Sequence, residues 1–484
     1  MSPSDKPFDE VKYKALTDGL EISEIKYNSI VNESNTTQRF DSEYFIKNYI
    51  KNINALASRE HDTLYPRFAH VKGGKRLPLT ASFAKSGIRY ARAEDMKGKF
   101  LNVSNSPFIS EDLHDLLKLY TTVYNDVILT IVGSIGDVAV NKLHETINLT
   151  ENCVRLHCCS PNMSAYLFCF LLSTYGQLQI KRETVGTVQP KLAIERIKLF
   201  KVPIFNTDFY NSIDSIVEKS WQKMQSAQLE YADAERLLHN AINFDIEPVS
   251  VDVKSLSESF MRSGRLDAEY YQPKYDTLFE TLSKFSTTHL GGRDGIVKIK
   301  KSIEPGSEAY QTEGVPFVRV SDVNKFEIIE PSIKLSHEIV PEIEKLYPRK
   351  GTILLSKDGS VGIAYKVMED MQVVTSGALL HLTLKDNNKV LPDYLTLVLN
   401  SQIVQLQAER DCNGAVIQHW KPSDIEKVII PLLDMDKQKV ISDKVQESFR
   451  LRKESKQLLD DAVKAVEMAI ETDEHTALLW LAMH

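Results

Sequence analysis

The chain has 484 residues, which at roughly 100–200 residues per domain predicts about two to four domains. Hydrophobic residues make up 42% of it and charged residues 26%, which excludes a wholly disordered or collagen-like chain. Its formal net charge is −7 at pH 7, so the protein is not basic all over. Any contact with nucleic acid therefore has to come from a local basic surface.

The termini and the cysteines predict a cytoplasmic protein. The longest apolar run is the eight residues from Ala165 to Leu172, whereas a membrane span needs about 18, so we expect no membrane contact. The first residues, MSPSDKPFDEVKYK, lack the basic-then-apolar order of a secretory signal. An odd, clustered set of cysteines then predicts reduced thiols. The five are Cys153, Cys158, Cys159, Cys169 and Cys412.

Six short signatures occur twice, in the same order and 226 to 228 residues apart. The first pair is RFDSEYF, from Arg39, and RLDAEYY, from Arg265. The others, in chain order, are Pro78 and Pro305 after basic stretches, IRYARAEDM and VPFVRVSDV, VGSIG and DGSVG, ETVGTVQ and CNGAVIQ, and the prolines of FKVPIF and VIIPLL. Such a long period predicts two similar domains related by a pseudo-twofold axis, rather than a solenoid.

The first part of each copy, 1–205 and 247–433, has short strand-like runs between turn signals. VILTIV precedes Gly133 and TILLS precedes Gly359. AYLFCFLLSTYGQLQI and DYLTLVLNSQIVQLQ predict amphipathic helices. We therefore expect two α/β globules in a chain of the α+β class.

A long helix is expected after each globule, in 206–246 and in 434–484. Apolar or small residues in the first recur at steps of three and four, without Pro or Gly. The expected seam residues are Ile213, Met224, Tyr231 and Leu238 in the first helix and Ile441, Val445, Leu459 and Val466 in the second. An apolar stripe needs a partner, so we expect the helices to pair as an antiparallel coiled coil. The alternative is that each helix folds onto its own globule.

These features resemble the specificity subunit of a type I restriction–modification system, over nearly the whole chain. The resemblance is carried by GGKRLPL at 73–79, IRYARAEDM at 88–96, the GSIG and GSVG turns, GTVQ, GAVIQ and the proline strand before each long helix. It implies two target-recognition domains, each of which reads one half of a bipartite DNA sequence. The RFDSEYF element departs from the simplest members, which leaves a related methylation-associated defence system open.

The resemblance also implies partners. The long helices would hold two DNA methyltransferase subunits and set the distance between half-sites, and motor-nuclease subunits can join. A helix of roughly 55 Å matches about 16 base-pair steps of about 3.4 Å. This chain would bind no cofactor, because S-adenosylmethionine belongs to the methyltransferase, which flips the target adenine out of the stack.

Candidate DNA-binding residues lie in loops of both copies. Local basic clusters would supply phosphate contacts, although an ordinary solvated surface is the alternative. These basic candidates are Lys75, Arg76, Lys181, Arg182, Lys191, Lys300, Lys301 and Lys357. Ser134 and Ser360 lie in Gly-x-x-Gly turns, where a backbone N–H can approach phosphate, although a plain hairpin turn explains the glycines equally well.

Glutamines follow the next glycine in each copy. Gln189 and Gln418 can bond to adenine, or can cap a loop. His419, Trp420 and Lys421 follow Gln418, where the first copy has the unlike sequence Pro-Lys-Leu, as expected of domains that read different bases. Core packing is the alternative for Trp420. Arg92 with Asp95, and Arg319 with Asp322, are interpreted as internal pairs that fix a loop.

Catalytic motifs are missing from the sequence. There is no Walker loop, HExxH motif, paired CxxC or Asn/Asp-Pro-Pro-Tyr run. The cysteines near His157 fit a packed strand better than a metal site, because alternate strand residues point to opposite faces. The sequence thus predicts a non-catalytic DNA-specificity subunit. The alternatives are a coiled-coil scaffold that binds only protein, and an enzyme with a diffuse active site.

Overall fold

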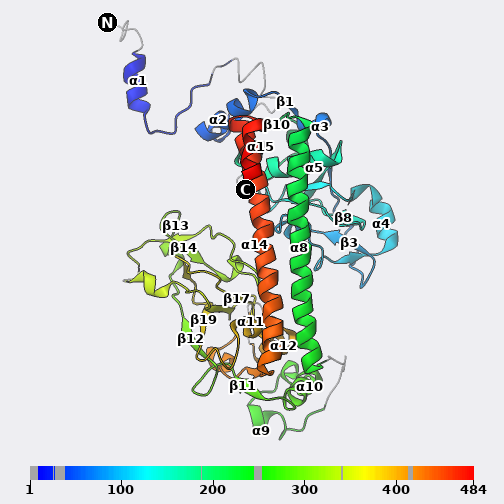
Figure 1. The fold of residues 1–484 in the computed structure, drawn as a ribbon, viewed down its shortest axis with the longest axis vertical. Helices are drawn as coiled ribbons and strands as arrows, with labels where there is room; N and C mark the ends of the chain where they lie inside the picture. The colour runs from blue at the N-terminus through cyan, green and yellow to red at the C-terminus, as the bar shows by residue number, and fades with distance from the viewer. Residues whose placement is uncertain are drawn as a thin grey trace. The chain divides into compact units, whose positions relative to one another are not determined.

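The computed structural model describes residues 9–25, 27, 39–186, 188–244, 253–339, 342–412 and 418–483 (Figure 1). The chain divides into two compact units. Unit 1 comprises 1–223 with 454–484, and unit 2 comprises 224–453. Within the described ranges, no helix has both the length and the apolar composition needed to cross a membrane.

Unit 1 is built on two four-stranded sheets. The first has the antiparallel order β2-β9-β6-β7, with β2 Ala69–Gly73, β9 Cys153–Cys158, β6 Val127–Thr130 and β7 Val138–Val140. The second has the order β4-β3-β8-β5, with β4 Phe108–Ile109, β3 Ile88–Ala91, β8 Ile147–Leu149 and β5 Thr121–Thr122. In it β3 and β8 are parallel. β1 (His61–Thr63) pairs with β10 (Lys201–Pro203) and joins the start of the domain to its end.

Unit 2 repeats this plan. Its first sheet has the order β12-β19-β16-β17, with β12 Val297–Lys301, β19 Leu379–Leu384, β16 Ile353–Ser356 and β17 Ala364–Lys366. Its second has the order β13-β15-β14-β18, with β13 Tyr310–Gln311, β15 Lys334–Leu335, β14 Val315–Val318 and β18 Val374–Thr375. β14 and β18 are parallel, as β3 and β8 are. β11 (Thr287–His289) pairs with β20 (Ile429–Pro431). The shared orders confirm the duplication. The second sheets share three strands and differ in the fourth, which is β5 beside β8 in unit 1 and β13 beside β15 in unit 2.

Each of the two predicted amphipathic helices is in fact two helices. The first is broken at Ser173 into α5 (Pro161–Leu172) and α6 (Thr174–Glu183), and the second at Ser401 into α11 (Pro392–Asn400) and α12 (Gln402–Asp411). The prediction of amphipathicity is also wrong for α5, whose residues from Ser164 to Leu171 are all buried. Both serines have extended backbone angles, which end one helix and begin the next.

A buried tyrosine holds the last strand of each domain. The hydroxyl of Tyr166 on α5 donates to the carbonyl of Pro203 at 2.7 Å, and that of Tyr394 on α11 donates to the carbonyl of Pro431 at 2.8 Å. A buried tyrosine hydroxyl needs such a partner. The pair of bonds fixes the strand from which each long helix departs.

The shorter helices complete both units. Unit 1 has α1 Glu10–Thr17, η2 Ser42–Phe45, α2 Lys47–Ala57, α3 Leu64–Arg67, η3 Ala93–Met96, α4 Glu111–Leu117, η4 Lys118–Tyr120 and α7 Ile194–Lys198. Unit 2 has α9 Phe260–Ser263, η5 Ala268–Tyr271, α10 Pro273–Leu282, η6 Ser307–Ala309, η7 Val320–Asp322, η8 Ile343–Leu346 and α13 Pro422–Ile425.

The two long helices are α8 (Thr207–Ile242) and α14 (Met435–Glu471), and part of each belongs to each unit. The expected seam residues are buried except Met224, which is half-buried. In unit 1 the hydroxyl of Ser220 donates to the carbonyl of Ser455 at 2.7 Å, and Ser455 donates back at 2.8 Å. Small side chains at this level let the two helices approach closely.

The same helices pair antiparallel in unit 2 (Figure 1). Ser448 donates to the carbonyl of Ala227 at 2.6 Å, and Lys444 pairs with Glu230 at 2.7 Å, so numbers rise along one helix as they fall along the other. The helices also pack on the globules. In unit 1 the ring centroids of Phe100 and Trp221 lie 5.1 Å apart.

In unit 2, Phe326 covers the helix pair. Its ring lies 4.8 Å from that of Tyr231 on α8, and the guanidinium of Arg452 on α14 lies 3.6 Å from its centroid. Burial lowers the pKa of Arg452 to about 10. Pairing between the helices and packing onto a globule, which the sequence offered as alternatives, therefore occur together.

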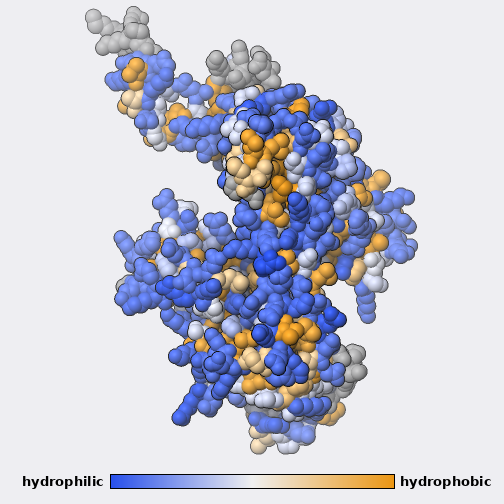
Figure 2. All heavy atoms as spheres, in the orientation of Figure 1, coloured by the Kyte–Doolittle hydropathy of each residue, from blue (hydrophilic) through white to orange (hydrophobic). Residues whose placement is uncertain are grey.

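The chain ends in α15 (Glu474–Met483), where Figure 2 shows hydrophobic residues at the surface. Ala477 is buried, whereas Leu479 and Met483 are exposed. This helix is thus apolar on its exposed face as well as on its packed face.

A buried histidine in unit 2 predicts a pH dependence of folding. His381 on β19 is 7% exposed, and its Nε2 lies 2.8 Å from the hydroxyl of Thr375. Burial, with Lys300 nearby, lowers its pKa to about 4. The unfolded chain, with a pKa near 6.5, binds the proton more tightly. The stability that His381 contributes is therefore complete above about pH 6.5 and falls as the pH drops towards about 4.

We expect His381→Gln to remove this dependence, which amounts to about 3 kcal/mol for a shift of this size. Denaturant unfolding at pH 7.5 and pH 4.5 gives the fall in the free energy of unfolding between the two pH values, and this fall should be larger in the wild type than in the variant. An equal fall in the two chains would contradict the role of His381.

Candidate nucleic-acid interface

The turn between β6 and β7 presents Ser134 at its tip. Gly133 and Gly136 have φ of +82° and +97°, which glycine adopts most easily. Gln177 on α6 donates to the carbonyl of Gly136 at 3.0 Å, and a Cβ on Gly136 would lie 3.1 Å from that side chain. The hairpin turn therefore accounts for both glycines, while Ser134 remains exposed.

The turn after β16 in unit 2 is built in the same way. Gly359 and Gly362 have φ of +72° and +84°, and Gln405 on α12 donates to the carbonyl of Gly362 at 2.8 Å. Ser360 is exposed at the tip. Each unit thus has an exposed serine at the tip of a turn, and equivalent glutamines, Gln177 and Gln405, bond to the backbone of the two turns.

A second loop lies beside the first turn of unit 1. The backbone N–H groups of Val185 and Lys191 each donate to the other's carbonyl, at 2.9 and 2.8 Å, and close the loop 186–190. Gly186 has φ of +103°, and a Cβ there would lie 2.9 Å from the carbonyl oxygen of Gln189. A bridge between Val132 and Lys191 joins this loop to the turn.

In unit 2 the segment 418–421 takes the corresponding place. A bridge joins Asp358 to His419, and the N–H of Gly359 donates to the carbonyl of Gln418 at 2.9 Å. The two bridges make His419 the counterpart of Lys191, so Gln418 corresponds to Pro190. Gln189 and Gln418 are therefore not equivalent, because GAVIQ is one residue longer than GTVQ. Gly414, which the sequence matched to Gly186, lies outside the described residues.

The described parts of both loops expose polar and basic side chains. Gln189, Lys191, Gln418, His419 and Lys421 are all exposed, as is Lys181 on α6. His419 also pairs with Asp358 at 2.8 Å. Lys181, Lys191 and Lys421 form no ion pair with any residue that the structure describes, so their charges face solvent.

Three of the predicted DNA-binding residues point inwards instead. Trp420 is 1% exposed and belongs to the core of unit 2, at the place of buried Leu192 in unit 1, so packing is the alternative that the structure shows. Lys357 is buried and paired with Asp358. Arg182 stacks on Tyr44, with its guanidinium 3.8 Å from the ring centroid. Lys357 needs its partner because a buried charge without one is costly.

The paired basic stretches differ between the units. Lys75 and Arg76 follow β2 and are exposed, with Arg76 3.7 Å from Glu151. Lys300 and Lys301 lie within β12, where Lys300 donates to the carbonyl of Lys345 at 2.9 Å and Lys301 pairs with Glu304 at 2.9 Å. Exposed ion pairs contribute at most about 1 kcal/mol, so a phosphate can replace Glu151 beside Arg76 and Glu304 beside Lys301.

The Arg–Asp pairs fix loops, as the sequence indicated, through backbone bonds in both units and also through an ion pair in unit 2, where Arg319 Nε lies 3.6 Å from the carboxylate of Asp322. The carboxylate of Asp95 accepts the N–H of Arg92 at 2.7 Å, and that of Asp322 accepts the N–H of Arg319 at 2.9 Å. Each aspartate thereby caps a short 3-10 helix. The hydroxyl of Ser106 donates to Asp95 as well.

Part of the cysteine cluster lies on a packed strand, as predicted, because Cys153 and Cys158 are on β9, whereas Cys159 follows the strand and is exposed. Cys153 is buried on β9, and burial raises the pKa of its thiol to about 12. Among the residues that the structure describes, no group of three or more His, Cys, Asp or Glu side chains is arranged to hold a metal.

Sequence reasoning missed two apolar side chains next to the candidate loops. Val188 is 97% exposed between Gly186 and Gln189, and Leu79 is 95% exposed shortly after Arg76. An exposed apolar side chain beside basic residues suits contact with a thymine methyl group. The sequence signal that could have identified them is an apolar residue within a polar loop rich in turn residues.

The chain is similar to known proteins over both domains. Residues 68–207 and 294–460, more than half of the chain, match the family described as Type I restriction modification DNA specificity domain. Over 148 residues the chain is 24% identical to the type I restriction enzyme EcoBI specificity subunit of Escherichia coli, a segment that covers 30% of this chain and 31% of that one. The chain thus matches less than a third of that relative's length.

Two solved structures are similar over most of the chain. One is a type I restriction–modification S subunit from M. genitalium, 14% identical, covering 86% of this chain and 94% of that one with a TM-score of 0.35. The other is the HsdS subunit from Thermoanaerobacter tengcongensis, 14% identical, covering 86% and 97% with a TM-score of 0.27.

Replacing Gly186 by alanine should open the loop that it begins. The Cβ would meet the Gln189 carbonyl at 2.9 Å at a positive φ, which costs about 1–3 kcal/mol. Hydrogen exchange should therefore become faster at the amides of Val185 and Lys191. Gly264→Ala is the matched control, because its φ of +72° is positive but nothing lies within 4 Å of the new Cβ. Unchanged exchange in the Gly186 variant would refute the loop's dependence on this glycine.

Proposed function

The chain belongs to the family of type I restriction–modification DNA specificity subunits, and we propose that each of its two domains reads one half of a bipartite DNA target. It acts as a non-catalytic subunit that directs the chemistry of its partners. The observation that carries this proposal is a shared frame with unlike exposed side chains: Lys191 in unit 1 and His419 in unit 2 occupy equivalent bridges beside equivalent turns. Domains that read different bases require such a difference.

The exposed loops offer both kinds of contact that DNA recognition needs. Lysines supply phosphate contacts, which give affinity without sequence information. Gln189 and Gln418 supply amide groups that match the edge of adenine in the major groove. The basic surface is local, in agreement with a chain whose net charge is −7.

The proposed function includes protein partners that carry out the chemistry. Two DNA methyltransferase subunits would bind along α8 and α14 and carry S-adenosylmethionine, and motor-nuclease subunits would join them. The methyltransferase would flip a target adenine out of the stack. A helix of 36 residues, about 54 Å, would then set a spacer of about 16 base-pair steps. The complex would act in the cytoplasm, on double-stranded DNA.

The proposal is tested by mapping methylated adenines across the genome of cells that contain the methyltransferase with and without this chain. We expect a bipartite motif that disappears when the chain is absent. A methyltransferase that still binds the chain but methylates the same sites without it would contradict the specificity role. That result would favour the protein-binding scaffold.

A further inference from the structure

The RFDSEYF segment makes a stack of charged and aromatic groups in unit 1. Tyr44, in η2, is buried, and the guanidinium of Arg182 lies 3.8 Å from its ring centroid. The guanidinium of Arg39 lies 4.9 Å from the same centroid. Each contact is favourable because a cation is attracted to the face of an aromatic ring. One tyrosine therefore holds two arginines, one from its own segment and one from α6.

Arg39 also holds the backbone at the end of α6. Its Nη1 donates to the carbonyls of Arg182 and Thr184, at 2.8 and 3.2 Å. The last carbonyls of a helix have no partner within the helix, and a cation there also suits the helix dipole. Asp41 fixes the guanidinium from the other side, at 2.7 and 2.5 Å, and the bond to Arg39 lowers the pKa of Asp41.

Two further bonds complete the grip on this helix end. The hydroxyl of Tyr44 donates to the carboxylate of Glu183 at 2.9 Å, and Arg182 Nε donates to the carbonyl of Tyr44 at 3.1 Å. The next residue after Thr184 is Val185, which forms the pair of backbone hydrogen bonds with Lys191 that closes the exposed loop. The segment thus holds the residues from which the loop departs.

The RLDAEYY segment forms a similar stack in unit 2, around Tyr270, which is half-buried. Arg265 is held by Asp267 at 2.8 and 2.5 Å, and its guanidinium lies 4.4 Å from the ring centroid of Tyr270. The guanidinium of Arg410 lies 5.0 Å from the same centroid. Arg410 occupies the place of Arg182, next to the end of α12 at Asp411. The residues that follow Cys412 up to 417 lie outside the described ranges.

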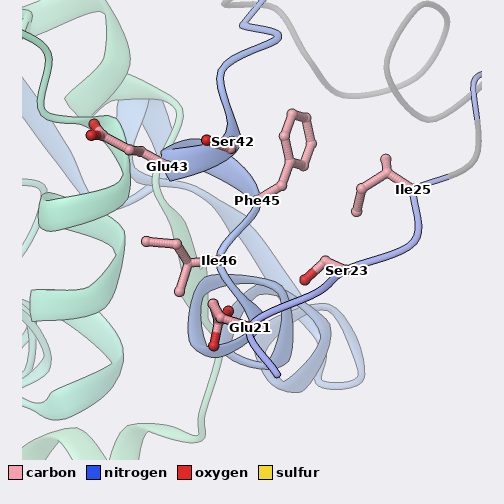
Figure 3. A pocket seen from close by; sticks show the side chains of 7 residues that line it. All are labelled: Glu21, Ser23, Ile25, Ser42, Glu43, Phe45 and Ile46. Carbon is pink, nitrogen blue, oxygen red and sulfur yellow. The ribbon is translucent and has the colours of Figure 1, made fainter. Parts of the chain in front are cut away.

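The other side of the first segment does not suit an anion. A pocket of about 430 Å³ there is lined by Glu21, Ser23, Ile25, Ser42, Glu43, Phe45 and Ile46. Figure 3 shows the turn with Ser42 and Phe45 on one wall and the segment with Ser23 and Ile25 on the other. The two glutamates in this lining, Glu21 and Glu43, disfavour a phosphate. Arg39 and Tyr44 instead contact charged and polar groups at the end of α6.

We propose that these two segments are clamps that position the base-reading loop of each domain, an inference that rests on the proposed function. Arg39 and Tyr44 in unit 1, and Arg265 and Tyr270 in unit 2, are positioning residues. In unit 1 they act through bonds to the end of α6, and in unit 2 through the stack of Tyr270 on Arg410 near the end of α12, so none of them needs to touch DNA. A loop that is held in one conformation by its clamp can present its side chains with the hydrogen-bond geometry that base discrimination requires.

The test uses the full chain with its methyltransferase and the map of methylated adenines as its readout. Tyr44→Ala should reduce discrimination in one half of the motif by roughly tenfold, a loss of the size of one mismatch. Tyr270→Ala should relax only the other half. Tyr44→Phe, which keeps the ring and removes the hydroxyl that donates to Glu183, should retain discrimination.

The outcomes separate the clamp from the proposed function. A wild-type chain that directs no bipartite motif would overturn the proposed function itself. A wild-type motif that both alanine variants leave unchanged, or relax equally in both halves, would overturn the clamp alone. If Tyr44→Ala does not accumulate as folded chain, Arg39→Lys makes the same test, because it keeps the charge beside Asp41 and loses the paired carbonyl bonds. Relaxation of the first half alone is then expected.

Discussion

The apolar stripes of α8 and α14 set the main constraint on this fold. A helix of 36 or 37 residues with such a stripe is not stable alone in water, so each stripe has to be covered. In both units the two helices cover one another, and small side chains such as Ser220 and Ser455 bond across the contact. The globules then complete the cover, through Trp221 in unit 1 and Tyr231 in unit 2.

The same frame serves two different surfaces. Tyrosines at equivalent positions hold the final strand of each domain, and glutamines at equivalent positions hold each glycine turn. On this shared frame the exposed residues are free to differ, because they contribute little to the core. Lys191 and His419 illustrate this, since the same bridge carries a lysine in one unit and a histidine in the other.

The sequence predicted the duplication, the long helices and the position of the turns, because each leaves a periodic or repeated pattern. It did not predict the breaks at Ser173 and Ser401, since apolar residues continue on both sides of each serine and only the tertiary packing shows the change of direction. It placed Trp420 and Lys357 in the DNA-binding set because basic and aromatic residues look alike whether buried or exposed. The function of Tyr44 was hidden because its partner, Arg182, is far away in the sequence.

The most direct test of two equivalent reading domains is to replace residues 61–203 by residues 287–431, which exchanges the first domain between its closing strands for the second. Thermal unfolding first establishes that the chain folds, and methylated adenines are then mapped in cells with the methyltransferase. We expect a motif in which both halves are the half-site of the second domain. A folded chain that binds the methyltransferase and still directs the original motif would contradict it.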